Sequence, residues 1–440
     1  MDRKSFAEAL ATAALAGPLI EEELRARWAE LLGVSRRWIS TLARRIVAEF
    51  GECGRPRRFR IVRFLLDDDG FAKAFDRQVD LTFIFAPAPR PRMSPAGKVA
   101  RAWKVPRIVT PAALARWLDL PFEQLAWFAD LKTLERLVPD GPLRHYRYRW
   151  LTKRDGSARL LEIPKSRLKA MQRRILAEIL DRIPPHPAVH GFRAARSIRT
   201  FVAPHIARDL VLRLDLRDFF PCIWRARVLA IFLTAGYPEP VATLLAGFCT
   251  NTTPRAVLEN APVTNATAHR RIRLLYARPH LPQGAPTSPA LANLAAWRLD
   301  CRLAGLAQAV GASYTRYADD LLFSGGADFA RRAHRFAIHV GAIVLEEGFE
   351  VHWHKLRAMR PGVAQRAAGL VLNERINFPR ADFDRLKAIL RNCVRHGPAS
   401  QNREKHRDFR AHLAGRLAHV EMVAPDRALK LRAEFERIAW

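Results

Sequence analysis

The sequence predicts an α+β fold with an added, mostly helical N-terminal region. Residues 1–50 and 110–137 carry apolar residues at helical spacing. Residues 144–165 alternate aromatic and basic residues and then continue as an apolar strand, as an antiparallel hairpin does. Leu210–Leu216 is a short, largely apolar segment with the length of a buried strand, and the apolar flanks within 314–325 suit a hairpin in a core. Strands and helices mixed in this way along one chain favour the α+β class.

Composition indicates a folded protein with a polyanionic partner. The chain has 440 residues, of which 49% are hydrophobic and 27% charged, so two or three domains with real cores are expected. It has 74 Lys and Arg against 43 Asp and Glu, a formal net charge of +31. Nucleic acid is the first candidate partner for such an excess and an anionic membrane surface the second. By composition alone, a ribosomal-type binding protein fits as well as an enzyme.

The cellular setting is also constrained by the sequence. No apolar run approaches the roughly 20 residues needed to cross a bilayer, and "MDRKSFAEAL" lacks a signal-type apolar core. The five cysteines are scattered and form no CxxC pair, which argues against a disulfide framework and a structural zinc site. We therefore expect a reduced, cytoplasmic protein with no membrane partner.

The N-terminal region, 1–97, is predicted to be an accessory region of helices that ends in a linker. "LLGVSRRWISTLARRIVAEF" (Leu31–Phe50) resembles the second half of a helix-turn-helix, because a Gly33 turn precedes an Arg-rich amphipathic helix. A basic helix packed on its neighbour explains the same pattern equally well. "APAPRPRMSPAG" (Ala86–Gly97) has four prolines and two arginines and is typical of an exposed linker.

The remaining elements follow in order along the chain. The hairpin of 144–165 has a basic tip, and "SRLKAMQRRILAEIL" (Ser166–Leu180) is predicted to be a helix. Residues 326–348 are also predicted to be helical. "FEVHWHKL" (Phe349–Leu356) alternates with period two, which predicts a half-buried strand, and the chain from Phe378 onward is helical and basic.

Three carboxylates are the strongest chemical signal. In "YTRYADDLLFSG" (Tyr314–Gly325), Asp319 and Asp320 stand side by side between apolar flanks, where unpaired charge is expensive to bury. Neighbouring strand residues face opposite sides, so a tight turn here would bring both side chains to one edge. Asp215 ends the strand in "LRLDLRDFF" and supplies a third carboxylate. A solvated turn is the alternative interpretation, and the apolar flanks disfavour it.

This constellation predicts a site for two divalent metal ions. Carboxylates from two strand ends can hold two ions about 4 Å apart, one activating a hydroxyl and the other stabilising a leaving pyrophosphate. Hard oxygen ligands favour Mg²⁺.

Other segments complete an inventory for nucleotidyl transfer. "LPQGAPTSPALANL" (Leu281–Leu294) has a turn-rich backbone that can approach a ligand closely and presents Gln283. Lys153, Arg154 and Arg159 on the hairpin could clamp phosphates. Each basic residue taken singly is also explained as a solvated surface charge.

These segments, in this order, resemble reverse transcriptases, and most closely the bacterial retron-type branch. "LRLDLRDFFPCI" is similar to the family's first catalytic motif, "LPQGAPTSPALANL" to its second and "YTRYADDLLFSG" to its third. "GFEVHWHKLR" (Gly348–Arg357) resembles the fourth, and "GLVLN" (Gly369–Asn373) the primer-grip strand. The resemblance covers about Val105–Trp440, and the ordered set is far more specific than "YADD" alone.

The resemblance implies a right-hand polymerase fold with fingers, a palm built on an antiparallel sheet, and a helical thumb. Fingers and palm would span 98–378 and the thumb 379–440.

The resemblance also implies roles for single residues. Asp215, Asp319 and Asp320, with the Leu216 carbonyl, would hold two Mg²⁺ ions, or Mn²⁺ in their place. Lys355 would protonate the leaving pyrophosphate.

Substrate contacts follow in the same way. Phe220 would be the steric gate that excludes the ribose 2′-hydroxyl and so selects dNTPs. Gln283 would touch the incoming nucleotide, and Arg159, with Lys153 or Arg154, its phosphates.

Two motifs depart from the retron pattern. "FVAPH" (Phe201–His205) stands where retron enzymes usually have NAxxH, and "AAG" (Ala367–Gly369) where they usually have VTG. Those family motifs are associated with the structured RNA partner, so the departures bear on RNA recognition and not on polymerisation.

The resemblance implies an RNA-directed DNA polymerase that copies part of a cognate structured non-coding RNA, primed from a 2′-hydroxyl, into a short DNA. Anti-phage defence and a toxin or effector protein partner belong to the same expectation. One alternative is another defence-associated or CRISPR-associated bacterial reverse transcriptase with different priming. A second is a non-catalytic RNA-binding protein with a polymerase fold, which the three retained aspartates disfavour.

Overall fold

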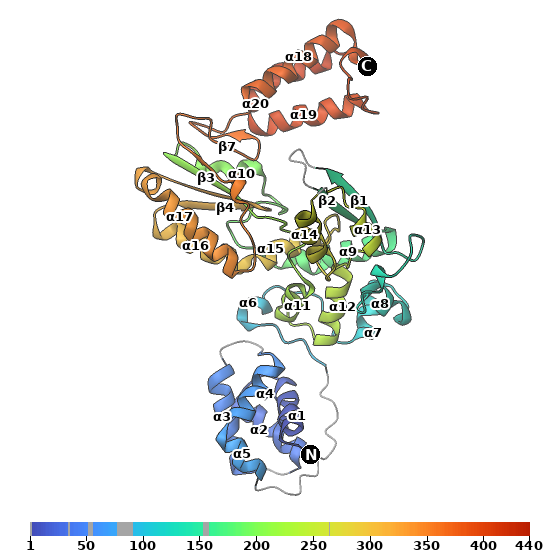
Figure 1. Cartoon of the computed structure of the whole chain (residues 1–440), viewed down its shortest axis with the longest axis vertical. Coiled ribbons are helices and arrows are strands. Elements are labelled where there is room, and N and C mark those ends of the chain that lie inside the picture. The colour runs from blue at the N-terminus through green and yellow to red at the C-terminus, as the bar shows by residue number, and fades with distance from the viewer. Residues whose placement is uncertain (1, 34–35, 52–55, 77–90, 153–157, 264) are drawn as a thin grey trace. The chain divides into compact units, whose positions relative to one another are not determined.

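The chain folds into two compact units of mixed helix and sheet. The computed structural model describes residues 2–33, 36–51, 56–76, 91–152, 158–263 and 265–440. One unit comprises Met1–Pro184 and Trp224–Ser288, and the other comprises Pro185–Ile223 and Pro289–Trp440. The predicted α+β class and the helical N-terminal region are confirmed (Figure 1). None of the helices in the described ranges has the length and apolar character that a membrane crossing requires.

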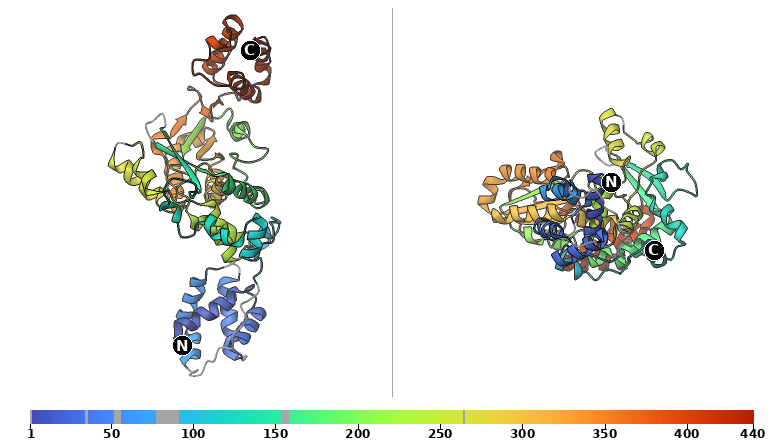
Figure 2. Two further views of the ribbon diagram at one scale, coloured as in Figure 1. Left: turned by 90° about the vertical axis from the view of Figure 1, so that its right-hand side faces the viewer. Right: turned by 90° about the horizontal axis from the view of Figure 1, so that it is seen from below.

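The N-terminal helices pack around a core of their own (Figures 1 and 2). They are α1 (Arg3–Leu15), α2 (Glu21–Leu32), α3 (Arg37–Phe50), α4 (Arg58–Asp67) and α5 (Asp69–Asp76). The buried members of this core all lie between Phe6 and Phe71. The indole nitrogen of Trp28, fully buried, donates to the Leu10 carbonyl at 2.9 Å and joins α2 to α1. These helices therefore bury their apolar faces against one another.

The rest of the first unit contains a two-stranded hairpin and a set of helices. Strands β1 (Tyr146–Thr152) and β2 (Ala158–Pro164) pair antiparallel, as predicted, and the hairpin tip lies outside the described residues. The predicted helix after it is α9 (Ser166–Glu178). The other helices are α6 (Gly97–Arg101), α7 (Pro111–Leu118), α8 (Phe122–Ala129), η1 (Leu134–Arg136), η2 (Leu180–Arg182), α11 (Arg225–Thr234), α12 (Glu239–Cys249), α13 (Arg255–Glu259) and α14 (Ala266–Tyr276).

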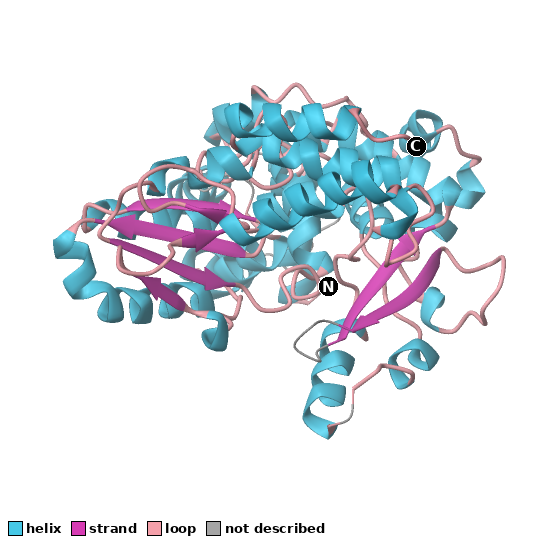
Figure 3. Cartoon of the chain, turned by 90° about the horizontal axis from the view of Figure 1, so that it is seen from above, coloured by secondary structure: helices cyan, strands magenta, loops and turns pink. Residues whose placement is uncertain are grey.

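The second unit is built on a four-stranded antiparallel sheet in the order β4-β5-β3-β6. Figure 3 shows the strands of this sheet in magenta. The strands are β3 (Leu210–Asp215), β4 (Ser313–Tyr317), β5 (Asp320–Gly325) and β6 (Arg357–Met359). The flanking helices are α10 (Ile198–Val202), η3 (Ala203–His205), α15 (Ser288–Ala295), which spans the unit boundary, α16 (Trp297–Ala309), α17 (Ala327–Glu346) and η4 (Trp353–Lys355). The predicted strand at 210–216 and helix at 326–348 are confirmed.

The period of two along the strands separates the two faces of this sheet. Phe323 packs its ring on Phe336 of α17 at 5.0 Å, so alternate residues of β5 face that helix. Asp320, Leu322 and Ser324 therefore lie on the opposite face. Asp215 pairs in register with Asp320, which places both carboxylates on the face away from α17.

The C-terminal part is a small hairpin followed by helices. Strands β7 (Arg366–Ala367) and β8 (Leu370–Val371) are joined by two residues that both have positive φ, Ala368 at 47° and Gly369 at 78°. The helices that follow share a core of their own: α18 (Arg380–His396), η5 (Pro398–Ser400), α19 (Phe409–Val423) and α20 (Pro425–Glu436). The predicted helical, basic C-terminal region is confirmed.

Candidate active site

A two-residue turn carries the first aspartate of the "YADD" pair. Tyr317 on β4 pairs with Asp320 on β5, so the turn consists of Ala318 and Asp319. Ala318 has a φ of 54°, a conformation that costs a non-glycine residue about 1–2 kcal/mol. The backbone N–H of Leu216 donates to the Asp319 carbonyl at 2.8 Å. This bond ties the turn to the end of β3, where Asp215 lies.

The sheet register brings the three predicted carboxylates together. Asp215 and Asp320 are direct partners across β3 and β5, and Asp319 precedes Asp320 in the turn. Leu216, predicted to contribute its carbonyl, is buried beside them. The sequence prediction that a tight turn gathers these residues at one edge is confirmed by this geometry.

Cationic side chains neutralise two of the three carboxylates. Lys355 Nζ lies 3.0 Å from Asp215 Oδ1. Arg213 donates to Asp320 through Nε at 2.9 Å and through Nη2 at 2.7 and 3.1 Å. Arg213 lies two residues before Asp215 on β3 and so on the same face of the sheet.

The segment that carries Lys355 is not the strand that its alternation predicts. Val351 forms a single bridge with Leu216, and Trp353–Lys355 is a short 3₁₀ helix, η4. The backbone N–H of His352 donates to the Asp215 carbonyl at 2.7 Å, which anchors the segment before it turns. The prediction of a strand at Phe349–Leu356 is therefore wrong, because its alternating residues belong to a turn that brings Lys355 to Asp215.

Excess negative charge remains at this edge. Burial, followed by the charge of Asp215, raises the pKa of Asp319. Burial also raises the pKa of Asp320, although Arg213 opposes the shift. Carboxylates whose pKa is raised in this way bind a divalent cation well. The cation removes the repulsion between them, and their oxygens are the hard ligands that it prefers.

The geometry limits which carboxylate oxygens face a metal ion directly. Within the described ranges, no three His, Cys, Asp or Glu side chains form a ready metal-binding group. Both oxygens of Asp320 are engaged by Arg213. The donor chemistry fits a divalent ion at Asp215 and Asp319, and Asp320 joins them only with a change in its contact to Arg213.

A buried ion pair supports the turn from below. Arg316, fully buried, donates to both oxygens of Asp300 at 2.7 Å. Its Nη1 also donates to the Ala318 carbonyl at 3.0 Å and to Asn293 Oδ1 at 3.1 Å. Tyr314 donates its hydroxyl to the same Asp300 at 2.8 Å. Sequence reasoning missed this pair, although a basic residue inside a buried strand was the available signal.

The predicted gate residue lies in the turn after β3. Phe220 is partly buried, and its ring centroid lies 6.2 Å from that of Phe192 in an edge-to-face arrangement. The Phe219 ring centroid lies 5.7 Å from that of Phe220. These aromatic contacts fix where the Phe220 ring can lie.

The predicted nucleotide contacts belong to the first unit. Gln283 accepts a hydrogen bond on its carbonyl from the Glu162 N–H at 2.9 Å, and Arg159 is exposed on β2. Lys153 and Arg154 lie outside the described residues. The roles of these four residues remain predictions.

A second buried ion pair holds the loop that presents Gln283, and sequence reasoning missed it too. His280 Nε2 lies 2.7 Å from Glu162 Oε2, and both side chains are fully buried. Asn251 and Thr253 each donate to Glu162 Oε1 at 2.8 Å. A Cβ added at Gly284 would lie 2.9 Å from the Glu162 carbonyl, so the loop packs closely on β2.

The histidine of "FVAPH" is a buried structural residue. His205 is fully buried, with Nδ1 at 2.7 Å from Ser324 Oγ and Nε2 at 2.8 Å from Thr315 Oγ1. It therefore links β5 to β4. Burial, helped by the charge of Arg208, lowers the pKa of His205 to about 3, so the ring is neutral at ordinary pH.

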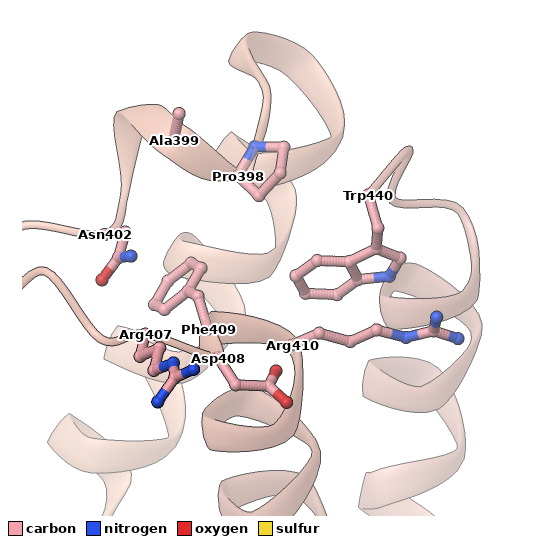
Figure 4. Close-up of a pocket in the computed structure, with 8 residues that line it drawn as sticks. All are labelled: Pro398, Ala399, Asn402, Arg407, Asp408, Phe409, Arg410 and Trp440. Carbon is pink, nitrogen blue, oxygen red and sulfur yellow. The ribbon is translucent and has the colours of Figure 1, made fainter.

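A pocket of ≈550 Å³ lies among the C-terminal helices (Figure 4). The Trp440 indole and the Phe409 ring line it, and the Arg410 guanidinium lies 5.8 Å from the indole centroid. Aromatic faces beside arginines are typical of sites where unpaired nucleobases stack. The remaining lining residues are Pro398, Ala399, Asn402, Arg407 and Asp408.

Comparison with known proteins identifies the family. The model of the family "Reverse transcriptase (RNA-dependent DNA polymerase)" matches residues 151–388. The chain is 43% identical over 293 residues to the retron Mx65 reverse transcriptase of Myxococcus xanthus, covering 67% of this chain and 65% of that protein. It therefore spans slightly less than two thirds of that relative.

Two further relatives agree. The retron Mx162 reverse transcriptase of Myxococcus xanthus is 34% identical over 353 residues, with 77% of this chain and 69% of that protein covered. The retron Ec86 reverse transcriptase of Escherichia coli is 30% identical over 262 residues, with 59% and 73% covered. Together with the aspartates gathered at the end of β3 and in the β4–β5 turn, these matches establish that the chain belongs to the reverse transcriptase family of RNA-dependent DNA polymerases, in its retron-type branch.

Proposed function

We propose that this chain copies part of a cognate structured non-coding RNA into a short DNA that stays joined to that RNA. The observation that carries this proposal is the convergence of Asp215, Asp319 and Asp320 in a chain whose relatives are retron reverse transcriptases. Cytoplasmic anti-phage defence, with a toxin or effector protein as partner, is the biology that fits such a product.

Asp215, Asp319 and Asp320 would hold two Mg²⁺ ions, with the Leu216 carbonyl as a further ligand. Bound ions would supply two effects: activation of the attacking 3′-hydroxyl and stabilisation of the leaving pyrophosphate. Lys355 holds Asp215 through a direct ion pair that orients this carboxylate in advance. Asp320 would join the ions with a change in its contact to Arg213. The Lys355 ammonium, 3.0 Å from Asp215, is the proton donor for the leaving group.

Substrate selection would depend on aromatic and basic side chains. Phe220, backed by Phe192, would exclude a ribose 2′-hydroxyl and so select dNTPs. Gln283 would contact the incoming nucleotide. Arg159, with Lys153 or Arg154, would bind its phosphates.

The architecture would be that of a right hand. The four-stranded sheet of β3 to β6 would form the palm, the β1–β2 hairpin with its helices the fingers, and α18 to α20 the thumb. The aromatic pocket around Phe409 and Trp440 would receive an unpaired base of the RNA.

The test is Asp319→Asn, assayed for primer extension on an RNA template and for RNA binding. We expect synthesis to fall below detection and RNA affinity to change less than about twofold, because the carboxylate serves the metal site and not the phosphate contacts. Asp328→Asn is the matched control, since Asp328 is exposed at the start of α17. Loss of RNA binding together with synthesis would show that the pair is structural.

A second arm tests sugar selection. Phe220→Ala removes the ring that would meet a 2′-hydroxyl, so ribonucleotide incorporation should rise at least about tenfold. Unchanged incorporation would remove Phe220 from the gate role.

A further inference from the structure

The outward face of α3 carries a regular stripe of arginines and small residues. Its apolar face, which includes Ile39, Leu42 and Ile46, is buried in the N-terminal core. Arg37, Thr41, Arg44 and Ala48 are exposed. Their spacing of four, three and four residues places them on one side of the helix. The small side chains between the arginines leave room for a close approach to the helix surface.

Basic charge continues onto the start of α4. Arg57, Arg58, Phe59 and Arg60 are exposed there, and the Phe59 side chain is 61% exposed. The guanidinium of Arg60 lies 5.6 Å from the centroid of the Phe50 ring at the end of α3, so the two basic segments are neighbours.

The two segments are strongly polarised in charge. From Arg36 to Arg63 the sequence has nine arginines and two acidic residues. Some are paired, such as Arg44 with Glu21 at 3.5 Å and Arg58 with Glu8 at 3.1 Å. Arg37, Arg57 and Arg60 have no acidic partner among the residues that the structure describes. Such a surface attracts a polyanion.

We propose that α3 and the start of α4 form a docking surface for B-form duplex DNA. Helix α3 follows α2 after a connection of four residues that begins with Gly33 in the left-handed conformation, and the two helices pack together. In helix-turn-helix proteins the second helix of such a pair enters the major groove.

The geometry of the groove selects DNA over RNA. The major groove of B-form DNA is about 12 Å wide and admits an α-helix. The major groove of A-form RNA is deep and too narrow for side chains to read. Helix α3 would therefore lie in the groove, with Arg57 and Arg60 on flanking phosphates. This binding is separate from the polymerase reaction and does not depend on the proposed function.

The experiment compares full-length variants on a 20-base-pair DNA duplex and an RNA duplex of the same sequence. Arg37→Glu with Arg44→Glu should lower DNA affinity at least about tenfold and reduce the slope of log affinity against log salt by about 2. Lys4→Glu with Arg25→Glu is the matched control. Lys4 is exposed on α1 and Arg25 on α2, within the same N-terminal group of helices, and the change in charge is identical. The control should change affinity less than about twofold.

Photo-crosslinking separates this surface from other duplex-binding surfaces of the chain. A benzophenone amino acid in place of Thr41 should crosslink to the DNA duplex and not to the RNA duplex, and the same group in place of Arg25 should crosslink to neither. Primer extension should be unchanged in the charge variants. Equal crosslinking to RNA, or unchanged DNA affinity with no crosslink from position 41, would overturn the proposal.

Discussion

Among the residues that the structure describes, two fully buried ion pairs hold two loops by different chemistry. Arg316 and Asp300 support the Ala318–Asp319 turn of the second unit, and Glu162 and His280 hold the Gln283 loop of the first. Arginine stays charged over the whole physiological pH range, whereas histidine does not. The pair that supports the Ala318–Asp319 turn therefore keeps its charges across physiological pH, while the Gln283 loop is held by a pair that can titrate.

The charge state of the second pair follows from its contacts. The two ring nitrogens of His280 lie 2.7 Å from the Arg278 carbonyl and 2.7 Å from Glu162, an arrangement that favours the doubly protonated ring. Burial alone would lower the pKa of His280, but the charge of Glu162 outweighs it and the pKa is raised. Burial alone would raise the pKa of Glu162, and His280 lowers it.

The largest expected effect comes from breaking the arginine pair. Arg316→Met leaves Asp300 buried with its charge unpaired, which should lower the free energy of unfolding by about 3–5 kcal/mol. Urea denaturation at pH 8 should show the full loss, because the arginine does not titrate and the unpaired, buried Asp300 would take up a proton only as the pH falls. The double variant Arg316→Met, Asp300→Leu should recover most of it. A loss below about 1 kcal/mol would contradict the supporting role of the pair.

Breaking the histidine pair should have a smaller and pH-dependent effect. His280→Gln should lower the free energy of unfolding by about 2 kcal/mol, since Asn251 and Thr253 still donate to Glu162. Because the pKa of His280 is raised, its contribution to stability is full below pH 6.5 and is lost as the pH rises through the pKa of the folded state. The lowered pKa of Glu162 contributes stability that is full above 4.5 and is lost at more acid pH.

Denaturation curves at several pH values check this prediction. The difference between the parent and His280→Gln should be greatest between pH 4.5 and 6.5 and shrink in more alkaline solution. A difference that stays constant to pH 9 would erase the contrast between the two pairs.

A third buried side chain, His205, sharpens the contrast because its pKa shifts the other way. Its folded pKa of about 3 lies below the ordinary 6.5, so its contribution is full above pH 6.5 and is lost as pH falls toward 3. His205→Gln should cost about 1–2 kcal/mol at pH 7.5 through its two hydrogen bonds. This cost should decline in acid, as a pH series of unfolding curves would reveal, and a cost that grows in acid would be inconsistent with a neutral buried ring.

The smallest effect is expected at the β7–β8 turn. Ala368 has a positive φ of 47°, which glycine adopts without strain. Ala368→Gly should therefore raise the free energy of unfolding by about 0.5–1 kcal/mol, which thermal denaturation can resolve. Val371→Ala nearby serves as a control that leaves the turn unchanged, and a destabilised glycine variant would argue against strain at Ala368.

The sequence predicted the elements that carry local signals and missed those that depend on distant partners. The structure confirms that Asp215, Asp319 and Asp320 lie together, that β1 and β2 form a hairpin, and that the N-terminal and C-terminal regions are helical. Arg213 pairs with Asp320, which lies 107 residues away in the sequence. His280 pairs with Glu162, which lies 118 residues away. The spacing of hydrophobic residues does not predict such pairs, because a charged residue in a strand pattern is predicted to face solvent.

The prediction of a strand at Phe349–Leu356 was wrong for a related reason. Its alternation matched a strand, but the backbone bonds of Val351 and His352 to β3 end the pairing and turn the chain. Tertiary contacts thus overrode a local pattern. The roles of Gln283, Arg159, Lys153 and Arg154 remain predictions from the family resemblance.

We propose that this chain makes DNA joined to its own RNA, with Asp319 in the β4–β5 turn as one of the catalytic carboxylates. The most direct measurement is to purify the chain and its Asp319→Asn variant from the native host and sequence the DNA and RNA that accompany each. We predict one abundant structured RNA in both samples, with a short DNA joined to it only in the parent. DNA in both samples, DNA without a linked RNA, or RNA with no DNA in the parent would contradict the account.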